Sequence, residues 1–135
     1  MSFDEIPHTA DVKIHASAPT LEGLFSETFK ALMQVMYGTD RDGSVIREIR
    51  VESTDYESLL ADFLSEALYV SEVGGFVFSD ARVKIKDRVL WAELTGEPFD
   101  PLRHSAGTDV KGISYSELEI IHDANGYKLD IIFDV

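Results

Sequence analysis

The sequence has 135 residues, of which 44% are hydrophobic, and this suits a single domain with one core, residues 1–135, rather than two domains. The absence of cysteine excludes disulfides, thiolate metal sites and thiol nucleophiles. Twenty-five acidic and twelve basic residues give a net charge of −13, which disfavours tight direct binding to RNA or DNA and attracts cations or basic protein surfaces.

The first residues and the hydropathy of the chain indicate where in the cell the protein is expected. The first residues lack the basic and then apolar pattern of a secretion signal. No stretch approaches the roughly 20 apolar residues that a membrane-spanning helix needs. We therefore expect a cytoplasmic protein without membrane contact.

The first half of the chain predicts two strands and two amphipathic helices. Residues 10–18 alternate between apolar and polar side chains, which is the period of a half-buried strand, and β-branched residues at 45–53 favour another. The apolar spacing of residues 21–36 predicts a helix with Thr20 as its N-cap. A capping box at 54–57 begins a second helix that ends at Gly74-Gly75.

The second half predicts two hairpins. Residues 81–86 and 89–94 alternate on either side of Asp87-Arg88. Residues 110–121 and 127–135 flank a segment that ends in Asn125-Gly126, a sequence that favours a tight reversal.

The order of these elements is not the regular alternation of a parallel doubly wound fold. It favours the α+β class, in the form of a two-layer sandwich. We expect a mixed or antiparallel sheet of about six strands, with the two helices packed on one face.

Sequence signatures of catalysis are missing. There is no Gly-rich phosphate loop with its Lys, no His-Glu-x-x-His pair and no Gly-x-Ser-x-Gly elbow. A row of cations at alternate positions, Arg82, Lys84, Lys86 and Arg88, could follow a nucleic-acid backbone. Because no stacking aromatic residue is interleaved in this row, we interpret it as a solvated sheet face.

Acidic residues near both ends of the chain form the candidate site. Asp11 and Asp134 occupy the polar phase of the first and last predicted strands, and Val135 follows Asp134 with its terminal carboxylate. If these strands are neighbours, the carboxylates converge. Such a cluster raises its own pKa values, recruits a hard cation such as Ca²⁺ or Mg²⁺, or stays hydrated.

Sequence blocks along the whole chain resemble the archease family, and they follow the family's order. They are His-Thr-Ala-Asp at 8–11, Thr-Leu-Glu-Gly-Leu-Phe at 20–25, Leu-Leu-Ala-Asp-Phe-Leu at 59–64 followed by Leu-Tyr at 68–69, Gly-Glu-Pro-Phe-Asp at 96–100 with His104, Val-Lys at 110–111, and Phe-Asp-Val at 133–135. Where the family has the motif Lys-Ala-(Val or Ile)-Thr-Tyr-His, this chain has Lys-Gly-Ile-Ser-Tyr-Ser at 111–116. Lys111 is thus retained, whereas position 116 lacks the family's histidine.

The resemblance implies a non-catalytic activator of the RtcB-type RNA ligase of tRNA splicing and RNA repair, which promotes guanylylation and turnover of that ligase. It also implies a divalent-cation site at Asp11, Asp134 and Val135, usually described with calcium. Our hypothesis is that Asp11 and Asp134 bind the ligase, with Glu97, His104 and Lys111 at the rim of the contact.

Two alternatives from other classes remain open. The resemblance also links the family to chaperone-like modulation of a tRNA methyltransferase. A metal-dependent hydrolase is the other alternative, and turnover of phosphoesters by the isolated protein would reveal it.

Overall fold

The computed structural model describes residues 11–115 and 117–135. This part of the chain forms two helices, α1 (Leu21–Tyr37) and α2 (Tyr56–Gly74), and seven strands. The strands are β1 (Asp11–Ala18), β2 (Val45–Glu52), β3 (Phe76–Lys86), β4 (Val89–Pro98), β5 (Gly112–Ser114), β6 (Ile121–Asp123) and β7 (Gly126–Asp134). The predicted residue 10 of the first strand and position 116 lie outside the described residues.

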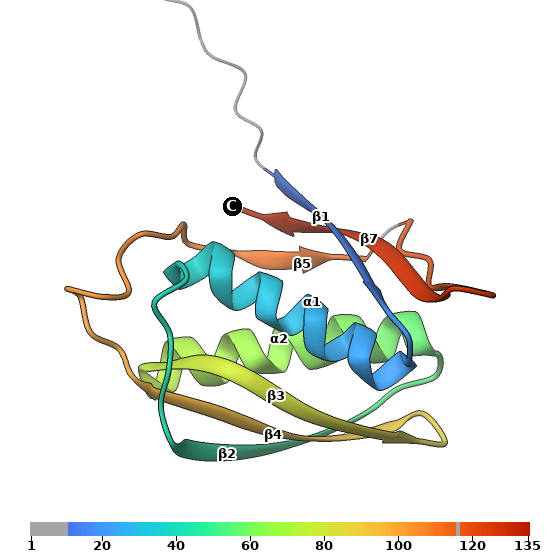
Figure 1. Cartoon of the computed structure of the whole chain (residues 1–135), viewed down its shortest axis with the longest axis horizontal. Helices are drawn as coiled ribbons and strands as arrows, with labels where there is room; N and C mark the ends of the chain where they lie inside the picture. Colours follow the sequence, from blue (N-terminus) through green and yellow to red (C-terminus); the bar gives the residue numbers. More distant parts are fainter. Residues whose placement is uncertain (1–10, 116) are drawn as a thin grey trace, which may run out of the picture.

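The strands form two antiparallel sheets with the helices between them (Figure 1). One sheet has the order β1-β7-β5, with β6 also paired to β7, and the other has the order β2-β4-β3. The α+β class and the antiparallel pairing predicted from the sequence are confirmed. The strands are divided between two sheets, however, so the helices are covered on two sides rather than packed on one face of a single sheet.

The breadth of the apolar helix faces explains this three-layer arrangement. The buried positions of α1 include adjacent residues, and so do those of α2: Leu24, Phe25, Thr28, Phe29, Leu32, Met33 and Met36 in α1, and Leu59, Leu60, Ala61, Phe63, Leu64, Ala67, Leu68 and Ser71 in α2. Adjacent residues of a helix point about 100° apart, so such a face is too wide for one sheet to cover. A second sheet buries the remainder.

Aromatic side chains fill the centre of the core. Phe63 of α2 stacks on Phe25 and Phe29 of α1, with ring centroids 6.3 and 5.7 Å apart. Phe29 also contacts Phe78 of β3 at 6.2 Å. These contacts join the two helices to each other and to the β2-β4-β3 sheet.

Both helices begin at side-chain caps. Thr20 accepts a hydrogen bond from the Gly23 N–H at 3.0 Å, as predicted. At α2 the cap is Asp55, one residue beyond the start of the predicted capping box, and it accepts from the Ser58 N–H at 2.7 Å. Neither helix is long and apolar enough to cross a membrane, within the residues described.

The predicted hairpins differ in how completely they form. β3 and β4 pair from Lys86 opposite Val89, with Asp87 and Arg88 in the left-handed region at the turn, as a two-residue hairpin requires. The terminal β6–β7 hairpin also forms. The predicted strand at 110–121 is interrupted, because β5 and β6 are each three residues long and Glu117, with a φ of +70°, breaks the extended backbone between them.

Candidate functional site

The two ends of the described chain pair with each other. β1 runs antiparallel to β7 with Asp11 opposite Asp134, and both residues are exposed. Directly opposed residues share a face of the sheet, with Cβ atoms about 4.5–5.5 Å apart. The two predicted carboxylates therefore lie side by side, and Figure 1 shows the end of β7 next to the start of β1.

Asp134 has a neighbour without a side chain on its other flank. Its neighbour across the β5–β7 pairing is Gly112, and a Cβ added there would lie 3.6 Å from the Asp134 Oδ2 atom. The Lys111 N–H donates to the Asp134 carbonyl at 2.7 Å, which fixes the end of the preceding loop beside the acids. We call Asp11, Asp134 and the adjoining Val135 the acidic pair site.

The oxygens of this site suit a hard cation. Carboxylates are the donors that Ca²⁺ and Mg²⁺ prefer, and an exposed location leaves room for water ligands. No group of three or more His, Cys, Asp or Glu side chains able to hold a metal occurs between residues 11 and 135, position 116 aside. Asp11 and Asp134 would thus hold an ion only together with oxygens of Val135 and water, and the metal remains a prediction.

A second polar pair lies further along the same sheet face. Nδ1 of His15 is 2.7 Å from Oδ1 of Asp130, the residue opposite it in the register, and Lys13 Nζ lies 3.8 Å from the same carboxylate. The hydrogen bond from His15 lowers the pKa of Asp130. Lys13 and His15 therefore pair with Asp130, and the acidic pair site is the part of this strand where a carboxylate has no such partner among the described residues.

Glu97 and His104 belong to a different cluster, the loop network, formed with Asp40 and Arg103. One guanidinium nitrogen of Arg103 lies 3.0 Å from both Glu97 and Asp40. The ring of His104 contacts Glu97 through Nε2 at 3.2 Å, and its Nδ1 accepts from the Asp100 N–H at 2.9 Å. This geometry places the proton of the neutral ring on Nε2, where it donates to Glu97.

The charges of the loop network shift one another. Hydrogen bonding to Arg103 lowers the pKa of Glu97 to about 2, with smaller contributions from the Asp42 N–H and His104. The same arginine lowers the pKa of Asp40, and the two carboxylates raise the pKa of Arg103. The network thus joins the end of β4 to the loop after α1 and to the loop that leads to β5.

The structure places the five residues predicted to bind a partner in two groups. Asp11, Asp134 and the backbone of Lys111 come together, whereas the side chain of His104 is fully buried and that of Glu97 is only 16% exposed. Glu97 and His104 are thus placed to shape the loop rather than to present themselves on its surface. Their role in partner binding stays a prediction.

Sequence reasoning did not identify Arg103 or Asp40 as site residues. Arg103 is adjacent to His104, but no local pattern connects it to Asp40, which is distant in sequence and reaches it only in the folded chain. The exposed tip of the loop, Leu102, has 95% of its surface accessible and was missed as well. A fully exposed large apolar residue is recognisable only once burial is known.

Comparisons with known proteins agree with these features. The archease protein family model matches residues 3–135. The archease of Methanosarcina barkeri is 35% identical over 139 residues, covering 98% of this chain and 95% of the relative. The archease of Pyrococcus furiosus is 37% identical over 123 residues and 87% of each chain.

Solved structures share the fold. The solution structure of Methanobacterium thermoautotrophicum protein 1598 superimposes with a TM-score of 0.76 at 25% identity and covers 96% of both chains. A crystal structure of an archease from Thermotoga maritima, described as a possible chaperone, gives a TM-score of 0.71 at 20% identity over 100% of this chain and 98% of the other. The family match over nearly the whole sequence and relatives above 30% identity lead to one conclusion: this chain belongs to the archease family.

Proposed function

We propose that this protein is a non-catalytic activator of an RtcB-type RNA ligase in tRNA splicing and RNA repair. It promotes guanylylation of the ligase histidine and sustains turnover. Membership of the archease family supports a role exercised on other proteins. The single observation that carries the proposal is the direct opposition of Asp11 and Asp134 at one edge of the molecule.

The acidic pair site is the contact that we propose for the ligase. Two exposed carboxylates, with no ion pair to either side chain among the described residues, present uncompensated negative charge to a basic or metal-containing pocket. An activator shifts a conformational equilibrium only by binding one state better than the other. The site therefore binds the guanylylation-competent state of the ligase more tightly than the inactive state.

A divalent cation, Ca²⁺ or Mg²⁺, is part of this proposal. Asp11, Asp134 and Val135 would hold it, and it would supply a positive charge that bridges these oxygens to acidic groups or phosphates of the ligase site. Gly112 supplies no side chain that would cover Asp134 from the side that Asp11 does not occupy.

The loop that ends at Lys111 forms the rim of the contact. The loop network holds its first part, and the Lys111 N–H fastens its last residue to β7. Between these points Leu102 projects into solvent. An exposed apolar side chain on a loop that is already ordered contributes binding free energy without a large cost in conformational entropy.

The experiment that tests the proposal measures label transfer from radiolabelled GTP to purified ligase, with and without this protein. Asp11→Ala and Asp134→Ala are compared with Glu66→Gln, which removes one exposed negative charge from α2. We expect both aspartate variants to lose most of the activation and Glu66→Gln to retain it. Circular dichroism establishes that all three are folded.

Normal activation by both folded aspartate variants would eliminate the acidic pair site as the contact. Equal loss in Glu66→Gln would show that net charge, rather than this site, is responsible. Full-length ligase is used throughout, because the state that accepts the guanylyl group is the state being measured.

A second candidate is chaperone-like modulation of an RNA-modifying enzyme such as a tRNA methyltransferase. The description of the Thermotoga maritima relative as a possible chaperone favours it. This function predicts that the protein co-purifies with the methyltransferase, alters its specificity and leaves ligase guanylylation unchanged. Measuring both enzymes with the same protein preparation separates the two functions.

A further inference from the structure

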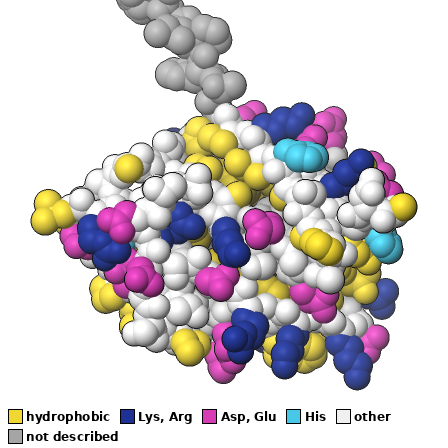
Figure 2. All heavy atoms as spheres, viewed as in Figure 1, with side chains coloured by type: hydrophobic (Ala, Val, Ile, Leu, Met, Phe, Trp, Pro, Cys, Tyr) yellow, Lys and Arg dark blue, Asp and Glu magenta, His cyan; other side chains and the backbone are white. Residues whose placement is uncertain are grey.

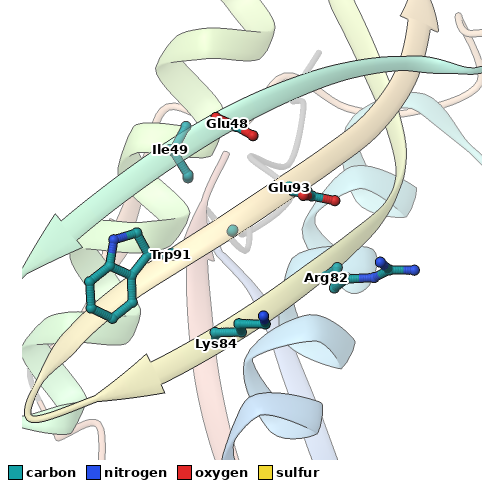
Figure 3. A pocket seen from close by; sticks show the side chains of 7 residues that line it. Glu48, Ile49, Arg82, Lys84, Trp91 and Glu93 are labelled. Carbon is teal, nitrogen blue, oxygen red and sulfur yellow. The ribbon is translucent and has the colours of Figure 1, made fainter.

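The outer face of the β2-β4-β3 sheet carries a hollow of about 390 Å³. Its exposed lining comes from all three strands (Figure 3): Trp91 and Glu93 from β4, Arg82 and Lys84 from β3, and Glu48 from β2. This face is on the opposite side of the molecule from the sheet that carries the acidic pair site (Figure 1). The hollow is therefore separate from the proposed ligase contact.

The exposed tryptophan of this hollow has a cation on each neighbouring strand. Trp91 is 44% exposed, and the strand register places Lys84 on one side of it and Arg50 on the other. The Arg50 guanidinium carbon lies 6.0 Å from the centroid of the Trp91 ring. Such a combination of an accessible aromatic surface and flanking cations is what stacking platforms for nucleic-acid bases provide.

The cations of β3 are unusual in having no partner. Among the described residues, five Lys or Arg side chains make no hydrogen bond, ion pair or ring contact, and they are Arg82, Lys84, Lys86, Arg88 and Lys111. Four of the five are alternate positions of β3 and its turn. In a chain with 25 acidic residues, partners for these cations would be easy to supply, so their isolation points to an external anion. Figure 2 shows Lys and Arg side chains along the lower edge of the molecule, next to this sheet.

The carboxylates of the hollow decide between two kinds of anion. Glu93 stands opposite Glu48 on one side and opposite Arg82 on the other. It makes no ion pair with Arg82. An acidic peptide would be repelled by Glu48 and Glu93. A nucleotide uses every group, since its phosphate binds the cations, its ring stacks on Trp91, and the N–H groups of its base donate to the carboxylates.

We propose that this face binds a short segment of single-stranded RNA. The cation row from Arg82 to Lys86 extends about 13 Å along β3. Lys86 does not line the hollow, so the row continues past it, which favours a strand over a single nucleotide. Guanine fits the carboxylates best, because its N1–H and N2–H₂ groups form two adjacent donors. The choice of RNA over DNA rests on the proposed function, whereas the binding surface stands independently of it.

The protein carries its own probe for this proposal, because Trp91 is the only tryptophan in the chain. An eight-nucleotide single-stranded RNA of mixed sequence is titrated into the full-length protein at low salt while tryptophan emission is followed. We expect saturable quenching from stacking on Trp91. With about three phosphates neutralised, the logarithm of the binding constant should fall against the logarithm of salt concentration with a slope of about −2.

Variants assign the binding to named residues. With fluorescein-labelled RNA and anisotropy as the readout, Trp91→Ala should weaken binding roughly 5- to 150-fold. Lys84→Ala should reduce the steepness of the salt slope by about 0.7. The matched control Lys128→Ala removes an exposed cation from β7 in the other sheet and should leave both quantities unchanged.

Glu93→Gln tests the recognition of base edges. The unaltered protein should prefer a strand containing central guanines over oligouridine of equal length by roughly fivefold or more. The variant should lose most of this preference while gaining affinity for oligouridine, because one repulsive charge has been removed. An unchanged preference would overturn the carboxylate contact.

Several results would overturn the proposal. These are unchanged tryptophan emission at low salt, equal quenching by an oligoglutamate peptide, tighter binding of the DNA strand of the same sequence, and equal weakening by Lys84→Ala and Lys128→Ala. Asp134→Ala should bind RNA normally while losing ligase activation. Failure of RNA binding and failure of the ligase proposal are thus distinguished in the same set of proteins.

Discussion

Asp11 and Asp134 are directly opposed across the β1–β7 pairing, with both side chains exposed on the same face of the sheet. Like charges at directly opposed positions destabilise an antiparallel pair. On the other side of Asp134, the opposed residue of β5 is Gly112, which supplies no side chain to neutralise the two carboxylates. A bound cation would turn this unfavourable pair into a favourable one.

The first prediction concerns Asp134→Asn and its dependence on calcium. In EDTA the variant should be more stable than the unaltered protein by about 0.2–1 kcal/mol, because the repulsion with Asp11 is relieved. In millimolar Ca²⁺ the order should reverse, since only the unaltered protein gains the free energy of ion binding. Urea unfolding followed by circular dichroism measures both.

Asp130→Asn is the matched control, because it removes a carboxylate from the same strand face that already has His15 and Lys13 as partners. It should show no calcium-dependent reversal. A calcium effect of equal size in Asp134→Asn and the unaltered protein would argue against metal binding at the acidic pair site.

The second prediction concerns Glu97 and the pH dependence of stability. Its pKa in the folded protein is about 2, below the ordinary value of 4.5, because Arg103 stabilises the ionised form. Its contribution is therefore complete above pH 4.5 and is lost as the pH falls toward 2. Compared with Glu97→Gln in urea unfolding, the unaltered protein should be more stable at neutral pH, and the difference should vanish near pH 2.

The third prediction concerns the aromatic centre of the core. Phe63 is fully buried and stacks on Phe25 and Phe29, so Phe63→Ala should lower the free energy of unfolding by about 3–5 kcal/mol. Phe63→Leu should cost less because it leaves a smaller cavity. Tyr69→Ala on the same helix, at a site 60% exposed, should change stability by less than about 0.5 kcal/mol. Chemical denaturation gives all three values.

The fourth prediction concerns the tip of the loop before Lys111. Leu102→Ser should leave the free energy of unfolding within about 0.5 kcal/mol of the unaltered value, because the side chain is 95% exposed. It should weaken ligase activation if the loop forms the rim of the contact. Val73→Ser, at an apolar site of α2 that is 69% exposed, is the control and should activate normally. Equal activation by both variants would remove the loop tip from the proposed interface.

Local sequence signals predicted most of the elements. The apolar spacing and the Thr20 cap fixed the position of α1, and the Asp87-Arg88 turn fixed the β3–β4 hairpin. That turn also carried an unused signal, because a two-residue hairpin that pairs Lys86 with Val89 necessarily pairs Lys84 with Trp91. The aromatic residue missing from the cation row on β3 was thus one strand away, at a position that hairpin register alone could have revealed.

Non-local relationships were predictable only in part. Strand phase suggested that Asp11 and Asp134 converge if their strands are neighbours, and the β1–β7 pairing meets that condition. The bond from Arg103 to Asp40 gave no such signal, since loop residues have no periodicity to restrict their direction. The division of the strands between two sheets was also missed, because alternation in a strand reports that one face is buried and not which layer buries it.

By itself, the sequence determined the class of the fold, the helices with their caps, the local hairpins and the excess of negative charge, because these depend on neighbouring residues and on composition. Only the tertiary structure decided that the helices lie between two sheets, that His104 is buried against Glu97, and that Trp91 is exposed beside the unpaired Lys84. These features depend on which distant surfaces come into contact, and that is settled by packing and burial over the whole chain.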